Sequence, residues 1–269
     1  MIGGAYRWEI RKLLRQKRTF AGLFAAVIYA LAFVVVLKLR SDAALPPDIP
    51  LAKQVKDTGA VLPLALLSFA TFFGAPVIAS IVPGDIVASE DSNNTLKMIL
   101  TRSAGRETIY AAKALASATY GIVLVATLLI VSLAGSTLAF GIHPATLEDG
   151  TVVSGAHAAG LTALAYAAYL LPIAVLVSIA FFLSTVTRNA AAAIIGTVIF
   201  SLTLEGIAVL PGLGSAKPYL FPAQYSAWQS LFGIPDASII RAVIVCAVYA
   251  AIPLIAGWTI FRRRDVAGA

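Results

Sequence analysis

The chain has 269 residues, of which 59% are hydrophobic and 12% are charged, and its mean hydropathy is +0.89. A soluble domain of this length does not reach such values, so the composition excludes a soluble globular protein and predicts a single membrane domain, residues 1–269. Cys246 is the only cysteine, which excludes a disulfide within the chain.

The basic segment at residues 6–18 predicts an amphipathic helix that lies at the membrane surface. Its apolar positions follow the spacing i, i+4, i+7 and i+8 of one helical face, and arginines occupy the other faces. These apolar positions are Tyr6, Ile10, Leu13 and Leu14. Two compatible interpretations stay open: the helix anchors the chain to anionic lipid headgroups, or it also offers a docking surface to a cytoplasmic protein.

Six later stretches are apolar over the roughly 20 residues that a helix needs to cross the hydrocarbon core. In chain order they are residues 19–37, 62–82, 115–140, 159–184, 190–210 and 239–261. The expected fold is therefore an all-α membrane protein with six transmembrane helices, preceded by the amphipathic helix.

The positions of lysine and arginine predict the orientation of these helices. If both termini are cytoplasmic, 14 of the 20 Lys and Arg residues lie in cytoplasmic segments and 6 lie outside. Because positively charged loops resist translocation, this bias favours a multi-pass plasma-membrane protein with cytoplasmic N- and C-termini. Membrane topology thus accounts for the net charge of +7, and no nucleic-acid partner is expected.

The segment between the second and third stretches, residues 86–113, is too long for a simple connection. Asn93 or Asn94 can cap a short helix there, and a second helix begins near Gly105 and continues into the third span. The apolar face of the short helix consists of Leu96, Ile99 and Leu100. Such a helix lies across the ends of two spans, where it either rests among headgroups or transmits force from a protein below.

In this segment the sequence resembles the type-2 ABC-exporter permeases. The matching positions are Glu90, Thr95, Leu96, Ile99, Leu100, Arg106 and Lys113. The chain departs from the family pattern at Asn94, Ser103 and Gly105, where glycine, proline and a hydroxyl residue are usual. The lead WEIRKLLRQKR and the closing FRRRDV also resemble the termini of this family, so the resemblance covers nearly the whole chain.

The resemblance implies a membrane-spanning permease subunit that forms the translocation path of an exporter. Two such subunits, identical or sister chains, form a lateral dimer, and each rests on a cytoplasmic ATPase through the short coupling helix between spans two and three. The chain has no G-x-x-x-x-G-K-[ST] phosphate loop, so ATP and Mg would be bound by the partner ATPase. No cofactor and no enzymatic activity are expected on this chain, and the remaining partner is membrane lipid.

Two sets of residues are the candidate functional positions. The coupling interface that the resemblance implies consists of Glu90, Asn94, Thr95, Leu96, Ile99, Leu100, Arg102 and Arg106. The alternative is that its charged members are ordinary solvated or headgroup-facing residues. Glu205, an acidic residue inside an apolar run, could line the translocation path, pair with Arg241, or reach the nearby interface.

The outer segments carry weaker signals. Residues 211–238 mix proline and glycine with aromatic residues, which predicts either short re-entrant helices, as the resemblance supports, or an aromatic belt at the interface. His143, Glu148, Asp149 and His157 share one outer loop, but their spacing matches no compact metal site.

Two other classes compete with the permease interpretation. An ion- or proton-coupled secondary transporter would normally carry several intramembrane charges and paired repeats, whereas this chain shows one such charge and no evident repeat. A membrane-embedded enzyme would show convergent acid, base or metal-binding residues, and none converge in the sequence.

Overall fold

The computed structural model describes residues 2–39, 57–72, 74–93, 95, 105–147, 150–234 and 237–263. Within these ranges the chain is almost entirely helical, and the strands β1 (Ala145–Thr146) and β2 (Val152–Val153) form a short antiparallel pair. The helices are α1 (Ile2–Leu13), α2 (Lys17–Leu39), α3 (Leu62–Ala70), α4 (Gly74–Asp85), α5 (Ala88–Ser92), α7 (Arg106–Phe140), α8 (Gly155–Thr187), α9 (Ala190–Val209), the 3-10 helices η2 (Gly214–Tyr219) and η3 (Phe221–Phe232), and α10 (Ile239–Arg263).

Five of the helices in these ranges, α2, α7, α8, α9 and α10, are long and apolar enough to cross a membrane. The chain is therefore an all-α membrane protein. Helices α3 and α4 would add a sixth span if they cross together, but they are bent by 67° relative to each other. The prediction of one continuous helix over residues 62–82 is wrong, and Pro76 near the start of α4 accounts for the break. Proline has no backbone N–H to donate to a carbonyl of the preceding turn, and its ring clashes with that carbonyl.

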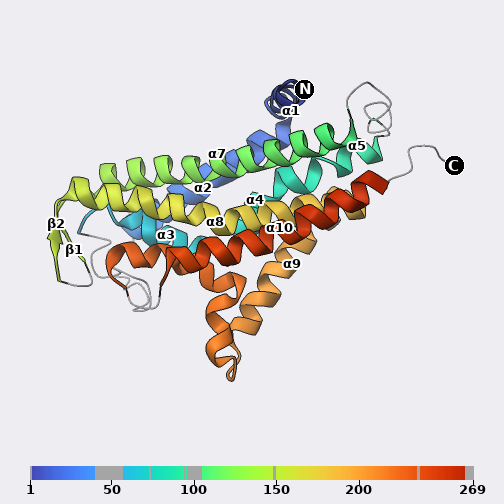
Figure 1. Ribbon diagram of the computed structural model, residues 1–269. Coiled ribbons are helices and arrows are strands. Elements are labelled where there is room, and N and C mark those ends of the chain that lie inside the picture. Colours follow the sequence, from blue (N-terminus) through green and yellow to red (C-terminus); the bar gives the residue numbers. More distant parts are fainter. Residues whose placement is uncertain are drawn as a thin grey trace.

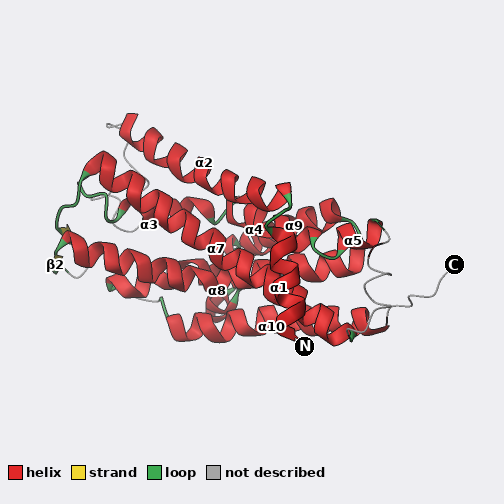
Figure 2. Ribbon diagram, turned by 90° about the horizontal axis from the view of Figure 1, so that it is seen from above, coloured by secondary structure: helices red, strands yellow, loops and turns green. Residues whose placement is uncertain are grey.

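Helices α2, α7, α8 and α10 run along the length of the molecule, with α8 in the middle (Figure 1). Helices α4, α7, α9 and α10 pack against α8. In the most apolar stretch of α8, 61% of the residues are buried. The β1–β2 pair lies at one end of the bundle, and α5 and the last turn of α10 lie at the other (Figure 1). Helix α1 crosses over α7 at a steep angle (Figure 2).

Helix α9 leaves the bundle at an angle, and η2 and η3 lead the chain back towards it (Figure 1). Within the predicted segment 211–238, the described residues are helical over 214–219 and 221–232. Phe221 and Trp228 of η3 are buried, at 0% and 2% exposure, and they pack against the bundle rather than forming an exposed belt.

Hydroxyl groups hold the start of α3 in place. Ser136 of α7 donates a hydrogen bond to the carbonyl of Gly59 (2.6 Å), and Thr162 of α8 donates to the carbonyl of Ala60 (2.7 Å). A carbonyl inside a membrane protein needs such a partner, because lipid provides none. The backbone of Gly59 also approaches α7 so closely that a Cβ there would lie 2.4 Å from the carbonyl oxygen of Ser136.

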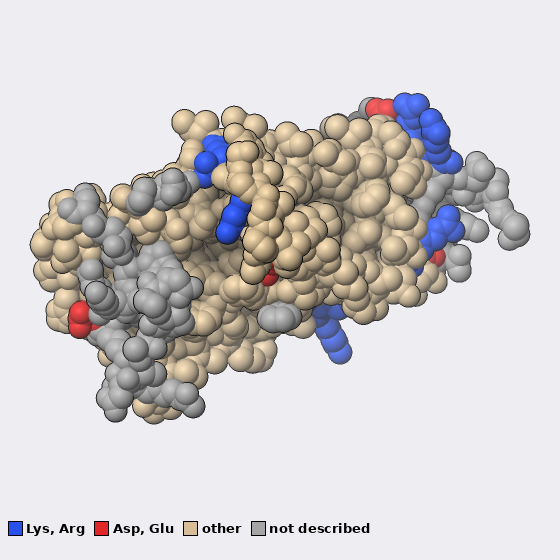
Figure 3. Space-filling view, turned by 90° about the horizontal axis from the view of Figure 1, so that it is seen from below, with Lys and Arg blue, Asp and Glu red and all other residues tan. Residues whose placement is uncertain are grey.

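The outer surface of the bundle matches a membrane environment. The face in Figure 3 is mostly uncharged, with Lys and Arg side chains at one end of it and a few others near its middle and at its lower edge. Large apolar side chains project outwards from several long helices, for example Phe24 (65% exposed), Ile130 (66%) and Ile252 (64%). Lipid is the solvent in which such side chains are stable.

Candidate functional site

Helix α1 packs across α7 with a face that is not purely apolar. Leu13 is buried on this face, and Tyr6 and Ile10 pack against the core, as the sequence predicts. Leu14 follows the last residue of α1 and is 60% exposed, so it does not pack against the bundle. The remaining buried position belongs to Glu9, which is 3% exposed. A carboxylate on a buried face requires a cation beside it.

That cation is Lys113 of α7, whose side chain is completely buried. Its Nζ lies 2.9 Å from Glu9 Oε1 and 2.7 Å from Glu90 Oε2, and it donates a hydrogen bond to the carbonyl of Ile86 (3.2 Å). Lys12 of α1 pairs with Glu90 and lies 3.9 Å from Glu9 Oε2. The four charged residues form what we call the charge cluster, which connects α1, α5 and α7.

The charge cluster is electrically balanced. Two carboxylates, Glu9 and Glu90, face two ammonium groups, Lys12 and Lys113. Desolvation of buried charges is unfavourable, and the attraction within a buried pair offsets it only when the geometry and hydrogen bonding are good. Removing one partner of a buried pair typically destabilises a protein by about 3–5 kcal/mol, because the other charge stays buried without compensation. The cluster therefore fixes the position of α1 on the bundle.

A second ion pair and a helix cap fix the α4–α5 corner. Asp85, the last residue of α4, pairs with Arg18 in the first turn of α2. Helix α5 begins without a side-chain cap of its own. Instead, the buried Ser184 Oγ of α8 accepts hydrogen bonds from the backbone N–H groups of Val87 (3.3 Å) and Ala88 (3.0 Å). These bonds satisfy two of the amide groups that a helix start leaves open.

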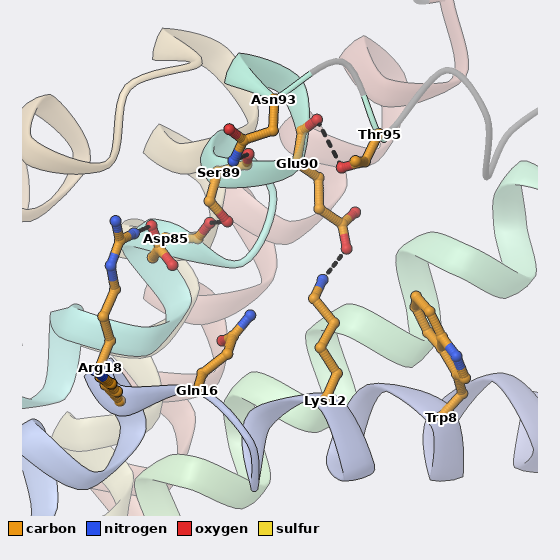
Figure 4. Close-up of a pocket in the computed structure, with 10 residues that line it drawn as sticks. Trp8, Lys12, Gln16, Arg18, Asp85, Ser89, Glu90, Asn93 and Thr95 are labelled. Carbon is orange, nitrogen blue, oxygen red and sulfur yellow. Dashed lines mark hydrogen bonds and ion pairs between the residues drawn. The ribbon is translucent and has the colours of Figure 1, made fainter.

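A cleft of about 670 Å³ lies beside the charge cluster. Side chains from α1 and the start of α2 project into it from one side, and side chains from α4 and α5 line the opposite side (Figure 4). The first wall includes Trp8, Lys12, Lys17 and Arg18, and the second includes Asp85, Glu90 and Thr95. Thr95 of this wall belongs to the predicted coupling segment.

The structure describes three of the predicted coupling residues. Glu90 belongs to the charge cluster, and Thr95 donates a hydrogen bond to the Glu90 carbonyl (3.1 Å). Arg106 begins α7, directly after the predicted start at Gly105, and donates to the carbonyl of Arg262 at the end of α10 (2.7 Å). The other five predicted residues, Asn94, Leu96, Ile99, Leu100 and Arg102, lie outside the described residues.

Glu205 lies apart from these residues. It sits near the end of α9, the end that is remote from α5, and is half-buried. Its Oε1 accepts a hydrogen bond from the buried Ser201 one turn earlier (3.5 Å). The structure therefore does not bring Glu205 together with the charge cluster.

Residues 52–267 match the model of a family that is described as protein of unknown function (DUF2705). The chain belongs to this family. A comparison with curated proteins found no match. Within this DUF2705 member, Glu90 and Lys113 lie inside the matched segment, whereas Glu9 and Lys12 precede it.

The charge cluster of this DUF2705 protein is only partly predictable from the sequence. Glu90 is a predicted site residue and Lys113 belongs to the resemblance, whereas Glu9 and Lys12 are not among the predicted positions. The available signal was the position of Glu9, which lies three residues after Tyr6 and four before Leu13 on the same helical face. A carboxylate in the middle of an otherwise apolar stripe indicates a buried partner.

Proposed function

We propose that this DUF2705 protein is the membrane-spanning permease subunit of an ABC transporter that works as an exporter. It crosses the plasma membrane six times, with both termini in the cytoplasm, and the bundle provides the substrate path. A separate cytoplasmic ATPase binds ATP and Mg and drives the cycle. A second permease subunit, either another copy or a sister chain, completes the dimer.

The observation that carries this proposal is the charge cluster. Its buried ion pairs join α1, α5 and α7, and α5 leads through Thr95 directly into the predicted coupling segment. Ser184 and Asp85 hold the same corner to α8 and α2. A push on the coupling segment would therefore be passed to four helices of the bundle and not be absorbed by a loose connection.

In this mechanism the closing of two ATPase subunits pushes residues 94–102 and tilts the helices of the bundle. Glu90 and Arg106 act as anchors on either side of the moving segment, because each is bonded to another helix, α7 and α10 respectively. The apolar positions Leu96, Ile99 and Leu100 provide the contact with the ATPase. The tilting opens the path towards the outside.

Photo-crosslinking in cells tests the contact. A photoreactive residue is placed at Leu96 or at Leu100, and the matched control places it at Leu138, which is 88% exposed at the opposite end of α7. The proposal predicts an adduct with a phosphate-loop ATPase from the first two positions and none from the third. Adducts with lipid alone at all three positions would contradict it.

The bent α3–α4 pair favours a second candidate, the ion- or proton-coupled secondary transporter. Discontinuous helices form the substrate and ion sites of many such transporters. Thr71 at the bend shares a hydrogen bond with the hydroxyl of Tyr169 (3.4 Å), and Glu205 of α9 interacts electrostatically with the same tyrosine. Transport that follows an imposed ion gradient in vesicles without ATP would favour this candidate over the permease.

A further inference from the structure

The cleft between α1 and α5 contains more positive charge than its own carboxylates neutralise. Asp85 is paired with Arg18, and Glu90 is paired with Lys12 and Lys113. Lys17 also lines the cleft, is exposed, and has no carboxylate partner within the described ranges. One ammonium group is therefore left for a ligand of opposite charge.

Further hydrogen-bond donors face the same space. The side chain of Arg18 is 61% exposed, and a guanidinium that binds one carboxylate through one nitrogen keeps other N–H groups free to donate. Trp8 is half-exposed, and its indole N–H has no acceptor in the described part of the chain. Trp8 lies at the opposite end of the cleft from Arg18 (Figure 4), whereas Lys17 and Arg18 are adjacent in sequence. A ligand with several acceptor oxygens, such as a phosphate, satisfies the donors of Lys17 and Arg18 together.

The position of the cleft indicates where such a phosphate comes from. The cleft opens beside the first turn of α2, a helix that is long and apolar enough to span the membrane. Tryptophan side chains gather at the level of the lipid headgroups, and basic pockets between membrane helices bind anionic headgroups. The volume of about 670 Å³ also falls in the range of small-ligand sites.

We propose that this cleft binds the phosphate of an anionic phospholipid, held by Lys17 and Arg18. This assignment goes beyond the permease function and does not depend on an ATPase. A lipid in this place would rest against Lys12 and Arg18, which fasten α1 and α2 to the α4–α5 corner. Its binding would therefore stabilise that corner.

Native mass spectrometry of the whole chain in a neutral detergent tests the proposal. The protein is titrated with phosphatidylglycerol and, separately, with phosphatidylcholine, and the bound lipids are counted. The test variant is Lys17→Gln. The matched control is Arg11→Gln, which removes the same charge from an exposed side chain of α1 that does not line the cleft.

The unaltered chain should retain one phosphatidylglycerol molecule in preference to phosphatidylcholine. Lys17→Gln should weaken the binding of this first molecule about fivefold, the effect of losing one cation beside an anionic headgroup, whereas Arg11→Gln should leave it close to that of the unaltered chain. Equal weakening by both variants, or by neither, would overturn the proposal. So would equal retention of the two lipids.

Inorganic phosphate at millimolar concentration distinguishes the two sources of the ligand. If it displaces the retained lipid from the unaltered chain, the cleft recognises the phosphate group itself and also accepts free phosphate. If it does not, the lipid chains contribute to binding and the ligand is the phospholipid. Both results support a phosphate site in the cleft, provided that Lys17→Gln weakens the binding as predicted.

Discussion

Replacing Lys113 with methionine should destabilise the protein by about 3–5 kcal/mol. Methionine retains much of the length and apolar packing of the lysine side chain, but it leaves Glu9 and Glu90 with Lys12 as the one remaining cation of the cluster. Lys113 is completely buried, and its Nζ lies 2.7 Å and 2.9 Å from the two carboxylates. Solvent therefore does little to screen the charge that the substitution leaves behind.

A compensating substitution separates this effect from the loss of packing. In the double variant Glu90→Gln with Lys113→Met, one carboxylate and one ammonium of the cluster remain, namely Glu9 and Lys12, whose charged atoms are 3.9 Å apart. The cluster is then balanced again. The double variant should recover more than half of the stability that Lys113→Met loses, and this coupling measures the ion pair directly.

Thermal unfolding in detergent, followed by tryptophan fluorescence, measures these effects. At about 2 °C per kcal/mol for a chain of this size, Lys113→Met should lower the midpoint by about 6–10 °C. Lys217→Met, which alters an exposed lysine of η2, serves as the control and should leave the midpoint unchanged. The reasoning is refuted if Lys113→Met behaves like the control, or if the double variant is as unstable as the sum of the single ones.

Two further predictions concern the supports of the bundle. Ser184→Ala should lower stability by about 1–3 kcal/mol in the same unfolding assay, because two amide groups at the start of α5 lose their acceptor. The control Ser178→Ala loses one hydrogen bond within its own helix and should lower stability less. Gly59→Ala should lower stability by about 1–3 kcal/mol, because its Cβ would lie 2.4 Å from a backbone atom of α7. In the control Gly160→Ala the new Cβ meets no atom within 4 Å, so this variant should be neutral or slightly stabilising. Indistinguishable effects within either pair would contradict the contacts described.

Much of the helical architecture could be predicted from the sequence, because long apolar runs and helix caps are local signals. Helix α9 begins at Ala190, as expected. The side-chain oxygen of Asn189 caps it by accepting a hydrogen bond from the N–H of Ala192 (3.1 Å). The break between α3 and α4 was not predicted, since residues 62–82 are apolar throughout. Pro76 is the local signal of the break, because proline near a helix start interrupts the preceding turn.

The charge cluster was only half predictable, for a physical reason. Glu90 and Lys113 belong to one segment whose pattern resembles a known family, so both were noticed. Glu9 meets Lys113 only because α1 crosses α7, and this crossing is a tertiary contact that helical periodicity does not contain. A buried carboxylate predicts that a cation is near, but it does not say which one.

The coupling helix stays a prediction, since most of its residues lie outside the described ranges. What the structure adds is the attachment on both sides of it, at Glu90 and at Arg106. The role of Glu205 in lining the translocation path likewise stays a prediction. A substitution at Glu205 should leave the stability effects at the charge cluster unchanged, because Glu205 lies near the end of α9 that points away from the bundle and makes no ion pair with the cluster in the described part of the chain.

The most direct test of the permease assignment is to identify the companions of the unaltered chain. The tagged protein is extracted gently from native membranes, and the proteins that copurify with it are quantified by mass spectrometry. The assignment predicts an ATPase with a phosphate loop at about one copy per chain, as expected for a subunit that lacks this motif itself. A chain that purifies without such a partner and transports its substrate in vesicles without ATP would contradict the assignment.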